Sequence, residues 1–106
     1  MTEGYESALM ASPLFSSFTE DGARSILASG EIIQLEAGKT LFEEGGAPDS
    51  VVFLLTGKVE AFVVRDGAER VFGQMDAGIL IGELAVLCEA PRAASVRVID
   101  DASVLR

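Results

Sequence analysis

A glycine, a glutamate and an arginine in one short stretch are the residues best placed to bind a small ligand. Gly82 precedes a run of good helix formers, and Pro91 requires the chain to reverse before it continues. A glycine at such a helix start lets backbone N–H groups approach an anion closely. Arg92 follows Gly82 by ten positions, so the returning chain can bring a guanidinium to the same place. Since its planar fork can hold two phosphate oxygens, the stretch predicts an anion site.

Glu83 needs a different explanation, because a carboxylate beside a phosphate repels it. A ribose hydroxyl would give this carboxylate a hydrogen-bond donor to accept from. Phosphate and ribose contacts within one short turn indicate a compact nucleotide. Each residue alone is most often a turn glycine, a surface acid or a solvated base. Their combination at this spacing is what favours a ligand.

These residues belong to two linked motifs, G-E-L-A-V-L at 82–87 and P-R-A-A-S-V at 91–96. Together the motifs closely resemble the phosphate-binding cassette of cyclic nucleotide-binding domains, most nearly that of the regulatory subunits of cyclic-AMP-dependent protein kinase. Sensor domains of catabolite-activator-type regulators belong to the same family. The resemblance implies that Arg92 and the N–H groups of the Gly82–Ala85 turn hold a cyclic phosphate, while Glu83 accepts from the ribose 2′-hydroxyl. The implied ligand-binding residues are Gly82, Glu83, Leu84, Ala85, Arg92, Ala93 and Ala94, with Ile81 and Ser95 as further candidates.

The resemblance also suggests how the base is recognised. Ala61, Phe72 and Met75 would face the purine, although ordinary core packing explains such apolar residues at least as well. Relatives that favour cyclic GMP often carry Thr at the position of Ala93, so the alanine favours cyclic AMP (cAMP). Ser95 stands where many relatives place Thr, and hydrogen bonding within the protein is its alternative role.

Composition limits the class of protein. The chain has 106 residues, enough for one domain, and a net charge of −9, which argues against nucleic acid as a partner of this segment. No apolar run is long enough to cross a bilayer, and the acidic N-terminus is not a secretory signal. The single cysteine, Cys88, is interpreted as a small buried hydrophobe and is compatible with a reducing compartment. We therefore expect a cytoplasmic protein.

Residues 1–30 predict a helical segment and residues 31–106 a β-sandwich. A short helix is expected over Glu6–Met10 and a second between an N-cap at Thr19 and Gly30, with an apolar cluster of Leu14, Phe15 and Phe18 between them. Short strands with turn punctuation follow, and they predict a mainly β, antiparallel fold, which the resemblance specifies as a double-stranded β-helix or jelly roll. Gly57 is expected to break the apolar strand 51–55 or to form a bulge or tight bend there, and Asp66-Gly67 is expected to form a hairpin. The strands are expected at 31–35, 40–43, 51–55, 58–65, 69–75 and 94–99, with a further one beginning at Val104.

An enzyme is the less favoured interpretation. The chain has no histidine, which removes Ser-His and Cys-His catalysis and the metal site of cupins, and it has no Walker loop or dinucleotide fingerprint. The acidic pairs Glu43-Glu44 and Asp100-Asp101 are expected in solvated turns. Two alternatives stay open: a ligand-free β-sandwich interaction module and a cupin-like sugar-binding protein. In the family, C-terminal helices close over the base and signal to an effector; we expect a sensor truncated before them, with no cofactor or metal and an unknown effector.

Overall fold

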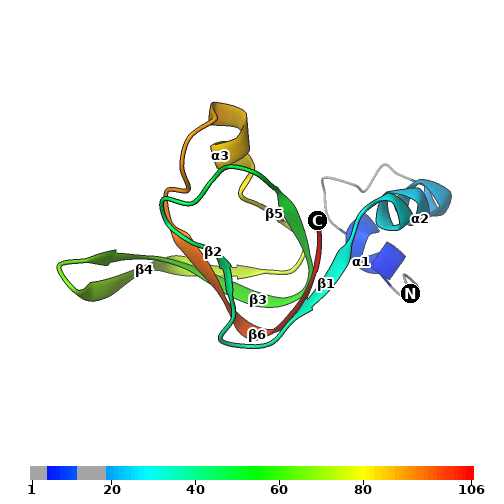
Figure 1. Cartoon of the computed structure of the whole chain (residues 1–106). Coiled ribbons are helices and arrows are strands. Elements are labelled where there is room, and N and C mark those ends of the chain that lie inside the picture. Colours follow the sequence, from blue (N-terminus) through cyan, green and yellow to red (C-terminus); the bar gives the residue numbers. More distant parts are fainter. Residues whose placement is uncertain (1–4, 12–18) are drawn as a thin grey trace.

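The structure is a computed structural model that describes residues 5–11 and 19–106, and it contains two N-terminal helices beside a rolled antiparallel sheet (Figure 1). Helices α1 and α2 lie together at one end, next to β1, whereas α3 lies outside the roll between β5 and β6. The β3–β4 hairpin projects away from both. The elements are α1 (Tyr5–Met10), α2 (Glu20–Ser29), β1 (Ile32–Leu35), β2 (Thr40–Phe42), β3 (Val52–Arg65), β4 (Ala68–Asp76), β5 (Leu80–Ile81), α3 (Glu83–Cys88) and β6 (Ser95–Leu105).

Two long strands organise the sheet. Its strand order is β1-β6-β3-β4, with β2 paired to β6 and β5 paired to β3, and every pairing is antiparallel. The predicted mainly β, antiparallel fold is therefore confirmed. Asp66 and Gly67 both have positive φ and connect β3 to β4 between the paired residues Arg65 and Ala68, as a two-residue hairpin requires.

The start of β3 is buried on both faces because its residues alternate between two apolar clusters. Val52 and Leu54 pack inside the roll, whereas Phe53 and Leu55 face the helices. This confirms the strand predicted from the apolar run at 51–55. The interior cluster also contains Val59, Ile81, Val96, Val98, Ala102 and Val104. The helix-side cluster contains Leu9, Ala23, Leu27 and Leu105, each of them buried.

Both N-terminal helices form where the sequence predicted, although α1 begins one residue earlier than expected, at Tyr5. The Thr19 hydroxyl accepts a hydrogen bond from the Gly22 N–H at 3.0 Å, and α2 ends at Ser29, directly before Gly30. The predicted cluster of Leu14, Phe15 and Phe18 lies outside the described residues. The division into a helical segment, 1–30, and a sandwich, 31–106, stays a prediction.

Two expected strand ends are absent, although the bulge or tight bend that is the other interpretation of Gly57 agrees with the structure. Gly57 lies within β3, where its φ of +93° produces a register shift and not an end. A Cβ there would lie 2.7 Å from the Ala102 Cα, so the glycine allows β6 to approach closely. Asp100 and Asp101 lie within β6, which continues to Leu105, so neither the turn nor a new strand at Val104 exists. The Asp101 carboxylate instead accepts a hydrogen bond from the Ala37 N–H at 2.8 Å.

The expected burial of Cys88 is also wrong, since its side chain is exposed. It lies in the last turn of α3, beside Leu87, which is 77% exposed, because this short helix stands outside the roll (Figure 1). In the two described ranges, no helix is long and apolar enough to cross a membrane.

Candidate ligand-binding site

The chain reverses tightly between β5 and β6. Gly82 has a φ of +92°, in the left-handed region, and α3 follows it directly. The pairing of Ile81 with Val52 fixes the start of this turn on β3. After α3, the Ala90 N–H donates to the Ala85 carbonyl at 3.0 Å, and Pro91 leads the chain back. The predicted strand, glycine turn, short helix and return are all present.

Arg92 lies where this return meets the Gly82 turn. The residue is only 5% exposed. Its Nη1 donates to the Gly82 carbonyl at 2.9 Å and its Nη2 to the Ser50 carbonyl at 2.6 Å. The guanidinium also lies 3.9 Å from the centroid of the Phe42 ring and 3.7 Å from an Asp49 carboxylate oxygen. The basic side chain is therefore held at the bend and does not point into solvent.

One donor of this guanidinium has no partner. The Arg92 Nε is buried and makes no hydrogen bond to any other described residue. Since a buried N–H without an acceptor is costly, such groups are rare in folded proteins. Arg92 therefore keeps one hydrogen-bond donor that no described protein atom satisfies.

A hollow of about 170 Å³ adjoins this arginine. It brings together seven of the twelve predicted site residues, and Leu84 lies in α3 within the same turn. Glu83 is half-buried, and its carboxylate has no hydrogen-bond or ion-pair partner among the residues that the structure describes. The lining residues are Phe42, Ile81, Gly82, Glu83, Ala85, Arg92, Ala93, Ala94 and Val96.

The remaining predicted site residues lie elsewhere. Ala61 and Met75 pack against the interior core cluster, which is the alternative role that the sequence allowed them. Phe72 is 68% exposed on β4. The Ser95 hydroxyl accepts a hydrogen bond from the Glu44 N–H at 2.8 Å, a bond within the protein. Contact of these four residues with a base or ligand stays a prediction.

Sequence reasoning missed the residues that hold Arg92 from the other side. Phe42 and Ser50 contact its guanidinium, as described above, while Gly45 and Gly46 hold its backbone. The Gly45 N–H donates to the Arg92 carbonyl at 2.8 Å, and the Arg92 N–H donates to the Gly46 carbonyl at 3.0 Å. The glycine pair marks a turn in the sequence, but no local pattern links that turn to a residue so much later in the chain.

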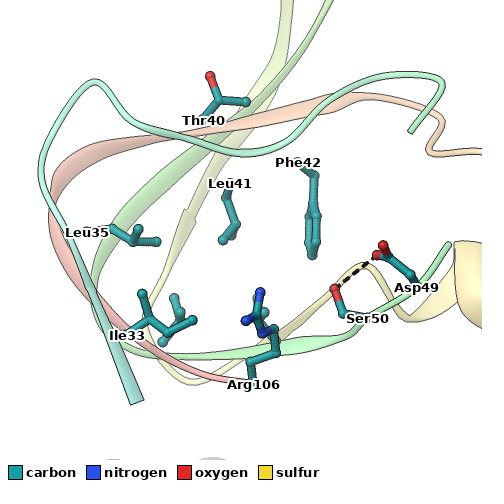
Figure 2. A pocket seen from close by; sticks show the side chains of 10 residues that line it. Ile33, Leu35, Thr40, Leu41, Phe42, Asp49, Ser50 and Arg106 are labelled. Atoms are coloured by element: carbon teal, nitrogen blue, oxygen red, sulfur yellow. Dashed lines mark hydrogen bonds between the residues drawn. The ribbon is translucent and has the colours of Figure 1, made fainter. Parts of the chain in front are cut away.

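A larger cavity of about 320 Å³ shares Phe42 with the hollow. In Figure 2, Leu41 and Phe42 point into it from one wall and Ile33 from the opposite wall. Asp49 and Ser50 lie at its edge, and its arginine, Arg106, is paired with Glu31 at 3.0 Å. Because the Arg106 side chain is 51% exposed, whereas Arg92 is buried and has an unpaired Nε, the smaller hollow at Arg92 is the better candidate for an anion site. The other lining residues are Leu35, Thr40, Val52 and Val104.

Metal ligands do not gather at either cavity. Over residues 5–11 and 19–106, no cluster of three or more cysteine, aspartate and glutamate side chains is arranged to hold a metal ion. The acids near the site are engaged or single: Glu44 pairs with Arg65 at 2.7 Å, and Asp49 lies beside Arg92.

Comparison with known proteins gives consistent results. The family model of the cyclic nucleotide-binding domain matches residues 32–106. A cAMP-dependent protein kinase regulatory subunit of Aspergillus fumigatus is 36% identical over 102 residues, which is 96% of this chain and 24% of the relative. The chain spans between 18% and 24% of the length of the first four curated relatives it matches.

Solved structures of similar fold include proteins with bound nucleotide. The regulatory domain of Toxoplasma gondii PKA with cAMP superposes with a TM-score of 0.79 at 30% identity, covering 98% of this chain and 40% of that one. The EAL enzyme Bd1971 in its cAMP-bound form gives a TM-score of 0.68 at 26% identity, covering 70% of this chain and 20% of that one. Its cGMP-bound form matches equally well, with a TM-score of 0.68.

Proposed function

We propose that this chain, which belongs to the cyclic nucleotide-binding domain family, binds cAMP in the hollow beside Arg92 and acts as a regulatory sensor that performs no catalysis. The observation that supports the proposal best is the buried guanidinium of Arg92 at the Gly82 turn, with its Nε–H unused. A phosphate oxygen is the acceptor that such a donor binds most strongly.

The phosphate would be held by Arg92 and by the backbone N–H groups of the Gly82–Ala85 turn. The net charge of −9 repels an anion at long range, so attraction must come from these local donors. The Gly82 and Ser50 carbonyls, to which Arg92 now donates, are neutral acceptors. An anionic phosphate oxygen competes well with them, because it also attracts the positive charge of the guanidinium and can be held bidentately.

Glu83 would accept a hydrogen bond from the ribose 2′-hydroxyl, since it lines the hollow without a partner in the described part of the chain. Replacing Glu83 by Ala should weaken cAMP binding by about 1.5–3 kcal/mol, the usual contribution of a hydrogen bond to a charged group. Titration calorimetry with 2′-deoxy-cAMP on the unaltered chain should show a similar loss. The two losses should not add, and a 2′-deoxy nucleotide that binds as well as cAMP would contradict this role.

Preference for cAMP over cyclic GMP rests on Ala93. This exposed residue lines the hollow beside Arg92 and has no hydroxyl to offer the guanine. The fold alone does not select between cAMP and cyclic GMP, because the Bd1971 structures include one bound to each nucleotide. Replacing Ala93 by Thr should improve cyclic GMP affinity by about 1 kcal/mol relative to cAMP, the scale of one neutral hydrogen bond. Competition binding with both nucleotides measures the ratio, and an unchanged ratio would place the guanine away from residue 93.

Calorimetric titration of the folded chain with cAMP, cyclic GMP and linear AMP tests the proposal itself. Saturable heat with the cyclic nucleotides, stronger for cAMP and absent for linear AMP, is the expected result. A folded chain that binds none of the three contradicts the proposal and favours a ligand-free interaction module.

The regulated effector would be a separate domain or protein. In a two-state sensor, a ligand shifts the equilibrium only as far as it binds one state better than the other. We propose that α3 is the element that moves when ligand binds, because its first turn lines the hollow while its last turn is exposed. A cytoplasmic setting stays a prediction.

A further inference from the structure

We infer that Glu44 and Arg65 are positioning residues for the nucleotide site, acting through the turn at 43–46 that holds the backbone of Arg92. The inference rests on the proposed function. Neither residue lines the hollow, and the resemblance assigned neither of them a role.

The turn holds Arg92 with backbone hydrogen bonds in both directions. The Gly45 N–H donates to the Arg92 carbonyl at 2.8 Å, and the Gly46 carbonyl accepts from the Arg92 N–H at 3.0 Å. The turn closes on itself through the Gly46 N–H and the Glu43 carbonyl, 2.9 Å apart. Where this turn lies therefore decides where the Arg92 Cα lies.

The turn has little of its own to keep it in place. Two of its four residues are glycines, which contribute no side-chain packing and retain wide backbone freedom. Apart from its bonds to Arg92, the turn is anchored to the rest of the described chain by Glu44. The Glu44 N–H donates to the Ser95 hydroxyl at 2.8 Å, which fixes the turn to the start of β6.

The Glu44 carboxylate fixes the turn to the end of β3. It pairs bidentately with Arg65, whose Nη1 and Nη2 donate to its two oxygens at 3.0 and 2.7 Å. Arg65 is itself fixed by a 2.8 Å bond from Nη1 to the Val64 carbonyl. The hydrogen bond from Arg65 holds the pKa of the Glu44 carboxyl below its ordinary value, so the pair is ionised at neutral pH. The result is a two-sided anchor, β3 through the side chain and β6 through the backbone.

The effect of the Glu44–Arg65 pair on ligand binding can be separated from its effect on stability. An exposed ion pair contributes little to stability, so its loss should barely change the melting temperature. A small shift of the turn, however, moves Arg92 relative to Gly82, and a binding constellation loses strength when its geometry loosens. The positioning role therefore predicts weaker binding at nearly unchanged stability.

The test compares charge reversal at two glutamates that each pair with an arginine: Glu44 pairs bidentately with Arg65, and Glu31 makes one contact with Arg106. Glu44→Lys places a second positive charge beside Arg65. Glu31→Lys does the same beside Arg106, away from the turn, and changes the net charge by the same amount. Calorimetry with cAMP should show about fivefold weaker binding for Glu44→Lys and less than a twofold change for Glu31→Lys. Adding Arg65→Glu to Glu44→Lys should restore most of the affinity.

A double-mutant cycle shows whether the effect passes through Arg92. In an Arg92→Lys background, Glu44→Lys should have almost no further effect, because the group it positions is already altered. Equal losses in both backgrounds, or equal affinities of Glu44→Lys and Glu31→Lys, would overturn the inference while leaving the proposed function intact. If the unaltered chain binds no cyclic nucleotide, the proposed function fails and this role fails with it.

Discussion

Replacing Arg92 by Ala is expected to weaken cAMP binding by about 1.5–3 kcal/mol, roughly ten- to over a hundredfold in the dissociation constant. The guanidinium is the buried cation of the hollow and has an unused Nε–H directed at no described protein acceptor. Losing it removes the charge-assisted contacts to the phosphate, and the acidic chain then repels the ligand without compensation. Calorimetric titration measures the loss directly.

The same substitution also perturbs the protein, because the Gly82 and Ser50 carbonyls lose their donor. Arg97→Ala is a matched control for this effect. Arg97 lies on the same returning chain, stacks on the Phe62 ring at 4.3 Å and pairs with Glu60 and Glu69 at 2.7 and 2.9 Å. It does not line the hollow. Arg97→Ala should lower the melting temperature but leave cAMP affinity within about twofold. If Arg92→Ala and Arg97→Ala lost the same cAMP affinity, Arg92 would act through folding alone.

The parts of the fold that the sequence predicted are those that local patterns determine. Alternating burial of the 52–55 run, the Asp66-Gly67 hairpin and the Thr19 cap each depend on neighbouring residues. The errors in the strands concern contacts between segments that are distant in sequence. Whether Gly57 ends a strand or bulges depends on how closely Ala102 approaches it, and that is a property of the β3–β6 pairing.

The candidate site divides in the same way. Gly82, Glu83 and Arg92 are close in sequence, so the turn and the return of the arginine could be predicted. Phe42 and Ser50 contact the guanidinium from positions 50 and 42 residues earlier, and only the rolled sheet brings them there. Composition cannot reveal such partners, nor could it show that Phe72 would be exposed on the projecting hairpin.

Replacing Gly82 by Ala should remove most cAMP binding and destabilise the fold, because this position combines two constraints. Its φ of +92° costs a non-glycine residue about 1–2 kcal/mol. An added Cβ would also lie 2.5 Å from Nη1 of Arg92 and 3.0 Å from the Phe42 ring. The guanidinium must then shift, and losing its hydrogen bond to the Gly82 carbonyl would cost about 1–3 kcal/mol more. Thermal melts measure the loss of stability, and calorimetric titration measures the loss of cAMP affinity.

Gly38→Ala separates the strain from the overlap. Gly38 has nearly the same φ, +94°, but a Cβ there would meet no atom within 4 Å. Both alanine variants should therefore share the loss from the left-handed backbone, whereas only Gly82→Ala should displace Arg92 and reduce affinity by more than about tenfold. If the two variants bound cAMP equally well, the close contact between the turn and Arg92 would have no part in ligand binding. A large loss of cAMP affinity in Gly82→Ala alone would instead show that Arg92 can occupy the site only because glycine has no Cβ at position 82.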